Sequence, residues 1–286
     1  MRTNTYQAEV ITMKSLKNLF IEMTAKNCNM HCKYCYIDFP KYKKVEDYIK
    51  LDIIKNAINE TNEENIECIY LTGAEPMTHP EFNAILRFCL TRSNVCICTN
   101  GSFINEKKAR FLKKVEDESE YVIWFKISLD HYEEVKNDSI RYRGAYRHSL
   151  FALKHLVKYG FTPVVTVVNY YNLSDDEIYR EYLKVFAKYS LNLKPANIQI
   201  VPYYDKNQNS ETIHCSNIPD KLDCIHGRTL TSSGIYTCPF LANDYRGRCG
   251  SSFADYNKRS SLETNFCNTC LNSSNAIFAI DFTKLM

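Results

Sequence analysis

The sequence predicts an α/β fold built on a parallel sheet. Short runs rich in β-branched and aromatic residues alternate with longer amphipathic stretches from residue 19 to about residue 203. The runs are 19–25, 68–73, 94–101, 121–130, 162–170 and 197–204. Six strands alternating with helices imply right-handed βαβ units, in a sheet that is open or curls toward an incomplete barrel. The functional loops should then lie at the carboxyl ends of the strands.

The helical patterns are clearest at 105–118, 146–160 and 174–189. Ser174 is a candidate N-cap, and Glu177 follows three residues later, which predicts a capping box. Gly160 is placed to end the helix before it.

The amino-acid composition of the chain changes beyond about residue 205, where a polar, turn-rich stretch precedes a cysteine-rich region. Residues 228–239 predict a hairpin whose turn contains Ser233 and Gly234. We therefore expect two domains, residues 1–204 and residues 205–286.

Composition fixes the broad class of protein. The 286 residues are 45% hydrophobic and 24% charged, as in ordinary globular proteins, and a net charge of +3 does not indicate a nucleic-acid surface. The N-terminus has no apolar signal segment, and no run has the roughly 18 apolar residues of a membrane span. We expect a cytoplasmic protein without nucleic-acid or membrane partners. In a reducing compartment, 13 cysteines favour metal binding or chemistry over disulfides.

Three cysteines, Cys28, Cys32 and Cys35, directly follow the first strand. Three thiolates on one loop can bind three irons of a [4Fe–4S] cluster and leave the fourth iron open to another ligand. Zinc is the alternative, but three cysteines without a nearby fourth donor make an incomplete structural zinc site. His31 is adjacent to Cys32 in sequence, which makes simultaneous ligation awkward.

A second motif follows the second strand, Thr72-Gly73-Ala74-Glu75-Pro76, where Gly73 allows close backbone approach and Glu75 can accept hydrogen bonds from an ammonium group. Together with CxxxCxxC and the aromatic Tyr34, this resembles the radical S-adenosylmethionine superfamily. The usual motif is Gly-Gly-Glu-Pro, so Ala74 is a mild departure. The resemblance implies a partial (β/α)6 TIM-like barrel. It also implies that the amino and carboxylate groups of S-adenosylmethionine chelate the open iron.

Further positions match the family in order along the chain. CTNGSF (98–103) resembles its Thr-Asn-Gly, ISLD (127–130) its fourth strand end, RYRGAY (141–146) its arginine segment and VVNYYN (167–172) its fifth strand end. By resemblance, Ser128 or else Asp130 contacts the ribose, and Arg141, in preference to Arg143, binds the methionyl carboxylate. The cofactor-binding residues that the resemblance implies are Tyr34, Gly73, Ala74, Glu75, Pro76, Thr99, Asn100, Ser128, Asp130, Arg141 and Val168. Singly, each has a simpler interpretation: Pro76 can start a helix, and Ser128 and Asp130 can be caps.

The remaining cysteines divide into two sets. Cys68, Cys89, Cys96 and Cys98 lie within strand or helix patterns and are expected to pack in the core. Cys224, Cys238, Cys267 and Cys270 can meet as a site of four thiolates, which by spacing suits zinc or a fully ligated [4Fe–4S] cluster. CIHGRTLTSSGIYTCP with FCNTC resembles the twitch domain, a shortened SPASM extension, and implies one auxiliary [4Fe–4S] cluster. Cys249 or Cys215 could replace one of the four ligands.

The resemblance also implies an activity. Members of the family cleave S-adenosylmethionine reductively to a 5′-deoxyadenosyl radical, using an external one-electron reductant such as flavodoxin or ferredoxin. An auxiliary cluster can accept an electron, which favours oxidation (dehydrogenation) of a small molecule. The alternative is cross-linking or epimerisation of a ribosomal peptide, less favoured because only 18 residues precede the first strand. A methyltransferase of the same family and a non-enzymatic iron–sulfur carrier or sensor stay open, and no catalytic base is predicted.

Overall fold

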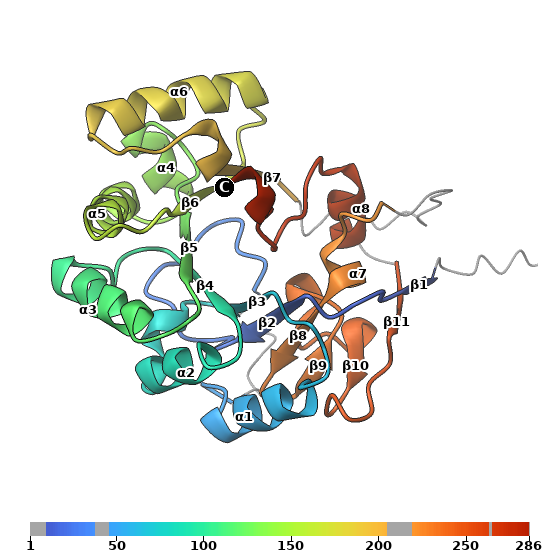
Figure 1. The fold of residues 1–286 in the computed structure, drawn as a ribbon. Helices are drawn as coiled ribbons and strands as arrows, with labels where there is room; N and C mark the ends of the chain where they lie inside the picture. Colours follow the sequence, from blue (N-terminus) through green and yellow to red (C-terminus); the bar gives the residue numbers. More distant parts are fainter. Residues whose placement is uncertain (1–9, 38–45, 205–218, 263–264, 286) are drawn as a thin grey trace, which may run out of the picture.

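The computed structural model describes residues 10–37, 46–204, 219–262 and 265–285. A nine-stranded sheet in the order β10-β9-β8-β2-β3-β4-β5-β6-β7 forms its centre (Figure 1). The six predicted strands are confirmed and run parallel: β2 (Asn18–Glu22), β3 (Cys68–Thr72), β4 (Asn94–Thr99), β5 (Ile123–Ser128), β6 (Val164–Asn169) and β7 (Ile198–Pro202). Among the described residues, the edge strands β7 and β10 do not pair with each other, so the barrel is open.

Helices follow the strands and cover the outer face of the sheet (Figure 1). They are α1 (Leu51–Glu60), α2 (Phe82–Cys89), α3 (Glu106–Asp117), α4 (Glu134–Ile140), α5 (Ala145–Lys158) and α6 (Asp175–Lys188). Ser174 caps α6 as predicted, accepting from the N–H of Glu177 at 3.3 Å. The expected capping box is incomplete, because the Glu177 carboxylate accepts from the Tyr132 hydroxyl instead. Gly160 follows α5 with a φ of +84°, as its stop position requires.

Both faces of the sheet are buried, as parallel sheets require. On the outer face, side chains such as Leu19 and Ile21 join the large core beneath the helices. On the inner face, Phe20, Tyr70, Cys96 and Trp124 are register partners across β2 to β5. Ala279 and Ile280 from the end of the chain pack against this inner row, so the barrel interior is partly filled by a C-terminal segment.

The C-terminal region continues the sheet. The predicted hairpin is β8 (Gly227–Thr231) and β9 (Gly234–Tyr236), with β10 (Arg248–Gly250) beside it and β8 parallel to β2. The two turn residues between β8 and β9 are 232 and 233, and Gly234 begins the return strand with a φ of +135°. The sheet therefore crosses residue 205, and the division into two domains there stays a prediction.

The remaining elements surround this hairpin. They are β1 (Val10–Thr12), which pairs with β11 (Arg259–Ser261), and the helices α7 (Asp223–His226) and α8 (Asn265–Asn272). None of the helices in the described ranges is long and apolar enough to cross a bilayer.

Candidate functional site

One pocket at the carboxyl ends of the parallel strands brings the first cysteine loop together with the later motifs. Cys28, Cys32 and Cys35 line it. Of the predicted cofactor-binding residues, it is also lined by Tyr34, Gly73, Ala74, Thr99, Asn100, Ser128, Asp130, Arg141 and Val168. Glu75 and Pro76 lie behind this lining. We call this cavity the functional pocket.

The cysteine loop is held by short polar contacts. The Thr24 hydroxyl accepts from the N–H groups of Lys26 and Asn27 at 3.1 and 3.0 Å and donates to the carbonyl of Asp47. The Met30 N–H points at the Cys28 sulfur at 3.3 Å. Burial raises the pKa of Cys28 to about 11.

The backbone conformation at position 73 requires glycine. Gly73 has a φ of +109°, and a Cβ at this position would lie 2.4 Å from the carbonyl oxygen of Thr24. The next N–H, that of Ala74, donates to the same oxygen at 2.7 Å. This close approach joins the end of β3 to the start of the cysteine loop.

Glu75 is fully buried and its carboxylate is occupied by protein donors. It accepts from the Thr99 hydroxyl at 2.8 Å, from the Asn100 N–H at 2.9 Å and from the Met77 N–H at 3.1 Å. Burial raises its pKa to about 7 in spite of these hydrogen bonds. In this geometry Glu75 ties the ends of β3 and β4 together, and its contact with an ammonium group stays a prediction. Pro76 starts a short 3-10 helix, and its part in cofactor binding stays a prediction.

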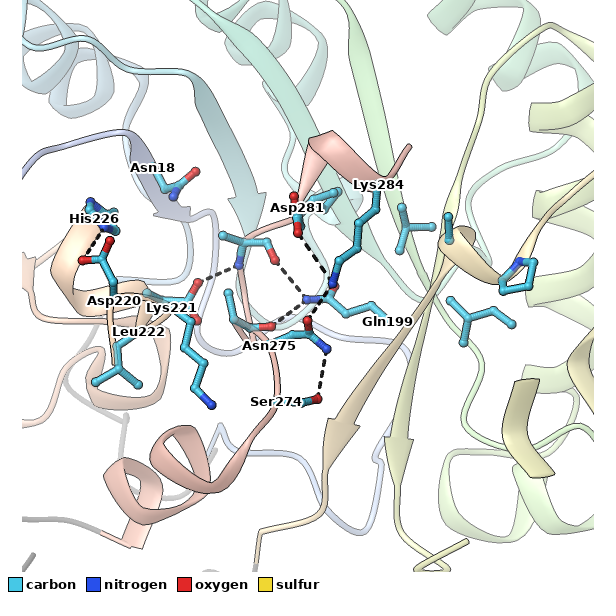
Figure 2. A pocket seen from close by; sticks show the side chains of 18 of the residues that line it. Asn18, Gln199, Asp220, Lys221, Leu222, His226, Ser274, Asn275, Asp281 and Lys284 are labelled. Atoms are coloured by element: carbon cyan, nitrogen blue, oxygen red, sulfur yellow. Dashed lines mark hydrogen bonds and ion pairs between the residues drawn. The ribbon is translucent and has the colours of Figure 1, made fainter. Parts of the chain in front are cut away.

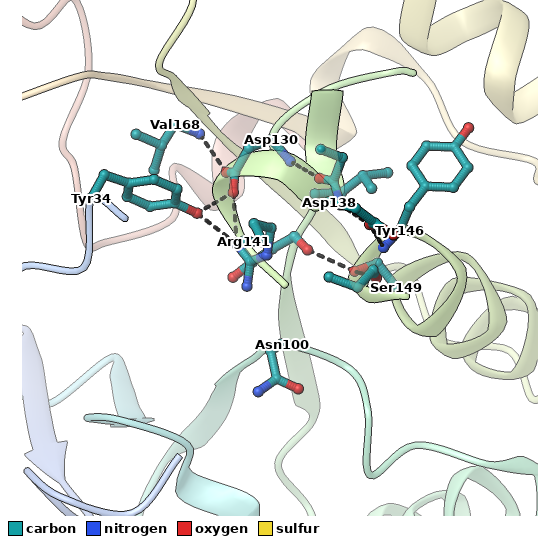
Figure 3. A network of polar contacts seen from close by, with 12 residues as sticks. Tyr34, Asn100, Asp130, Asp138, Arg141, Tyr146, Ser149 and Val168 are labelled. Carbon is teal, nitrogen blue, oxygen red and sulfur yellow. Dashed lines mark hydrogen bonds and ion pairs between the residues drawn. The ribbon is translucent and has the colours of Figure 1, made fainter. Parts of the chain in front are cut away.

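Asp130 and Arg141 form a buried ion pair beside the cysteine loop (Figure 3). The Asp130 carboxylate accepts from Arg141 Nη1 at 2.7 Å, from the Val168 N–H at 2.8 Å and from the Tyr34 hydroxyl. Arg141 Nε is buried without a hydrogen-bond partner in the described part of the chain. A carboxylate reaching this pocket would satisfy that donor, so the arrangement fits the methionyl group that the family implies. Arg143, the other candidate, is exposed.

Several residues that sequence reasoning missed also line the functional pocket. Lys126 and Thr166 are on the inner faces of β5 and β6, and Thr166 Oγ1 is buried without a partner among the described residues. The sequence alone does not show which face of the sheet a lysine or threonine in a strand points to, because that depends on the register of the strand. Cys98 packs against the inner core as expected, but its side chain also lines the pocket, whereas Cys68, Cys89 and Cys96 are fully buried. Phe240, Ile277 and Phe278 add an apolar wall from the C-terminal region.

The four predicted C-terminal ligands line one small, mostly apolar cavity, which we call the C-terminal cysteine cavity. They are Cys224 in α7, Cys238 before Pro239, and Cys267 and Cys270 in α8. Burial raises the pKa of Cys224 to about 12. Cys249 is buried in β10 and is not part of this lining, and Cys215 lies outside the described residues.

The fold and the pocket define an open, mostly parallel α/β barrel with a three-cysteine loop at its functional end. The Radical SAM superfamily model matches residues 24–185, and the chain belongs to this superfamily.

More specific relatives share part of the sequence. A GTP 3′,8-cyclase of Campylobacter jejuni subsp. doylei is 24% identical over 200 residues, which cover 67% of this chain and 57% of that protein. A GTP 3′,8-cyclase of Alkaliphilus metalliredigens is 25% identical over 162 residues, covering 53% of this chain and 47% of that protein. The chain thus spans about half the length of these relatives.

Among solved structures, native anSMEcpe with bound AdoMet matches with a TM-score of 0.62 at 15% identity. The match covers 84% of this chain and 79% of that one. At this identity, the likeness shows the shared fold.

Proposed function

We propose that this chain is a radical S-adenosylmethionine oxidoreductase that oxidises a small molecule and carries one auxiliary [4Fe–4S] cluster. The observation that carries the proposal is the C-terminal cysteine cavity. Three separate segments bring Cys224, Cys238, Cys267 and Cys270 to one cavity. Phe240 and Phe278 line both this cavity and the functional pocket. An electron acceptor placed there would be separated from a substrate by little more than these rings.

Zinc and a [4Fe–4S] cluster need different arrangements of sulfurs, and we assign a cluster to both sites. Among the described residues, no three cysteine, histidine or carboxylate side chains are grouped as the ligands of a single metal ion. Zinc requires such a group at roughly 2.3 Å from one ion. In a [4Fe–4S] cluster each cysteine binds a different iron, so its sulfurs stand farther apart.

We assign Cys28, Cys32 and Cys35 to the first cluster and the functional pocket to S-adenosylmethionine. Bound there and reduced by an external donor such as flavodoxin or ferredoxin, the cluster and S-adenosylmethionine would supply a 5′-deoxyadenosyl radical for abstraction of a hydrogen atom. Arg141 Nε would bind the methionyl carboxylate, while Asp130 keeps the guanidinium in place. Phe240, Ile277 and Phe278 would keep water from the reacting atoms.

A small molecule is the substrate class that the pocket supports best. An aromatic wall and the C-terminal segment take up part of the barrel interior, which leaves less room for an extended peptide. Cyclisation of a purine nucleotide is the second candidate, because the curated relatives are GTP 3′,8-cyclases. Against it, two cationic side chains of the described chain line the pocket, and both are engaged: Arg141 with Asp130, and Lys126 with backbone carbonyls. A triphosphate usually binds more cationic groups than this.

The first test is the iron and sulfide content after anaerobic reconstitution. Two clusters predict about 8 irons per chain, falling to about 4 in the Cys28→Ala/Cys32→Ala/Cys35→Ala variant. A fall in iron content from about 4 per chain to none would mean that the protein has no auxiliary cluster, and the argument for oxidation would fail.

The second test is the product of cofactor cleavage. The reduced holoprotein should release 5′-deoxyadenosine and no S-adenosylhomocysteine, which separates it from a methyltransferase, and an electron carrier would release neither. Stimulation of that release by added GTP would move the nucleotide candidate to first place.

A further inference from the structure

A segment shortly before the 3-10 helix Phe282–Lys284 crosses the barrel interior without forming a helix or strand. We call Ala276–Ile280 the C-terminal strap. Asp223, at the start of α7, accepts from three successive N–H groups of the strap, those of residues 277, 278 and 279, at 2.9, 2.9 and 2.8 Å. A buried carboxylate with three backbone donors is a strong anchor, because each bond is charge-assisted.

The strap is held from its other side by the inner faces of the sheet. Lys126 Nζ donates to the carbonyls of Ile277 at 3.2 Å and Phe278 at 2.7 Å. Gln199 Nε2 donates to further strap carbonyls (Figure 2), and the Tyr70 hydroxyl accepts from the Ile280 N–H at 2.9 Å. Every one of these contacts is to the backbone. The strap is therefore anchored by its backbone as well as by the packing of its side chains, so replacing one side chain leaves these polar contacts in place.

Three cavities meet at the strap. Ile277 and Phe278 line the functional pocket, and Phe278 also lines the C-terminal cysteine cavity. Ala276, Ala279 and Ile280 line a third cavity of about 770 Å³, which Gln199 also lines (Figure 2). The Phe278 ring lies 4.7 Å from the Phe240 ring and 5.8 Å from that of Tyr36, centroid to centroid. These contacts place Phe278 between the two cysteine sites.

We propose that Phe278 is a positioning residue that bounds the inner end of the functional pocket and seals it from the C-terminal cysteine cavity. Lys126, Gln199 and Asp223 hold the ring in place through the strap backbone. This inference rests on the proposed function, because sealing has a consequence only when the cavity holds a cluster. The seal would let a substrate pack against the ring near the cluster while keeping solvent and small solutes of the pocket away from its iron.

The test is access to the C-terminal iron. Reconstituted full-length protein is mixed anaerobically with dithionite and the chelator 2,2′-bipyridyl, and the release of iron is followed in wild type, Phe278→Ala and Phe282→Ala. The Cys28→Ala/Cys32→Ala/Cys35→Ala variant identifies which phase belongs to the C-terminal site. Phe282 is the matched control. It is an aromatic residue just beyond the strap that packs on Trp124, at 5.0 Å between ring centroids, and it lines neither cysteine site.

We expect Phe278→Ala to release the C-terminal iron several-fold faster than wild type, with Phe282→Ala unchanged. Added S-adenosylmethionine should slow the accelerated phase, because it fills the pocket through which the chelator enters. Equal rates in the two alanine variants, or an acceleration that S-adenosylmethionine does not alter, would overturn the proposal. Absence of C-terminal iron in wild type would instead defeat the proposed function.

Trp124 is the sole tryptophan of the chain, so its emission reports whether the end of the chain stays docked. If Phe278→Ala shifts this emission, Phe278→Leu, which retains an apolar side chain, is measured in its place and judged by the same two outcomes.

Discussion

The two cysteine sites of this protein are built in opposite ways. Cys28, Cys32 and Cys35 lie on one loop of eight residues and face a pocket that also contains the Asp130–Arg141 pair and several hydroxyl groups. The four C-terminal cysteines come from three separate segments and face a small, mostly apolar cavity. A cluster bound by the first set would have one side open to a polar ligand, whereas a cluster bound by the second set would be surrounded by sulfur and hydrocarbon. A site for chemistry and a site for storing an electron should differ in this manner.

Removing one cysteine from each site should give the largest difference. Cys32→Ala should reduce 5′-deoxyadenosine release to background, because the cluster that binds the cofactor loses one of three ligands. Cys238→Ala should lose about 4 irons and still release 5′-deoxyadenosine when no substrate is added. The measurement is chromatography of the quenched reaction with iron analysis of the same sample. Equal loss of release in both variants would mean that the two sites do not have separate roles.

The buried ion pair of the first site should dominate its stability. Arg141→Met leaves the Asp130 carboxylate buried with its neutral donors and no cation, which should lower the free energy of unfolding by about 3–5 kcal/mol. Arg143→Met removes an exposed arginine two residues away and should change it by at most about 0.5 kcal/mol. Urea unfolding of the apo protein measures both. Small losses of unfolding free energy, of similar size in both variants, would show that the ion pair is not needed to keep Asp130 buried.

The two regions meet at Glu22, where a pH effect should appear. Glu22 is the last residue of β2, and its carboxylate accepts a hydrogen bond from Asn243 Nδ2 of the C-terminal region at 2.5 Å. Burial raises the pKa of Glu22 from 4.5 to about 7. Between these values the folded chain holds a proton that the unfolded chain has released, so the free energy of unfolding falls as pH rises. Glu22→Gln cannot titrate. From pH 5 to pH 8 its stability relative to wild type should therefore rise by about 2–3 kcal/mol.

Urea unfolding at the two pH values measures this difference. Glu120→Gln, at an exposed position, controls for the loss of one carboxylate. A Glu22→Gln profile parallel to that of wild type would mean that Glu22 is ionised in the folded chain near pH 5.

Local patterns explain what could be predicted from the sequence. The strands and the three clearest helices lie close to their expected bounds because buried parallel strands and amphipathic helices differ in hydrophobic period. The motif residues meet in one pocket because parallel strands end at the same edge. The pairing of β8 with β2 and the path of the C-terminal strap were not predictable. Pairing between strands far apart in the sequence, and the course of an irregular segment, produce no repeating pattern of hydrophobic residues. The partnership of Asp130 with Arg141 was missed because each had been assigned to the cofactor alone.

The smallest expected effect concerns the position where this chain departs from its family. Ala74→Gly restores the usual Gly-Gly pair. Ala74 is not among the described residues with a positive φ, so the folded chain does not need glycine at this position. Glycine there adds conformational freedom to the unfolded chain. The free energy of unfolding should fall by about 0.4–1 kcal/mol, with S-adenosylmethionine affinity unchanged within about twofold. Gly73→Ala, whose Cβ would meet the Thr24 carbonyl oxygen, should cost more stability and affinity. Equilibrium binding and urea unfolding of the two variants separate these cases, and a large gain in affinity for Ala74→Gly would show that the alanine methyl obstructs the cofactor.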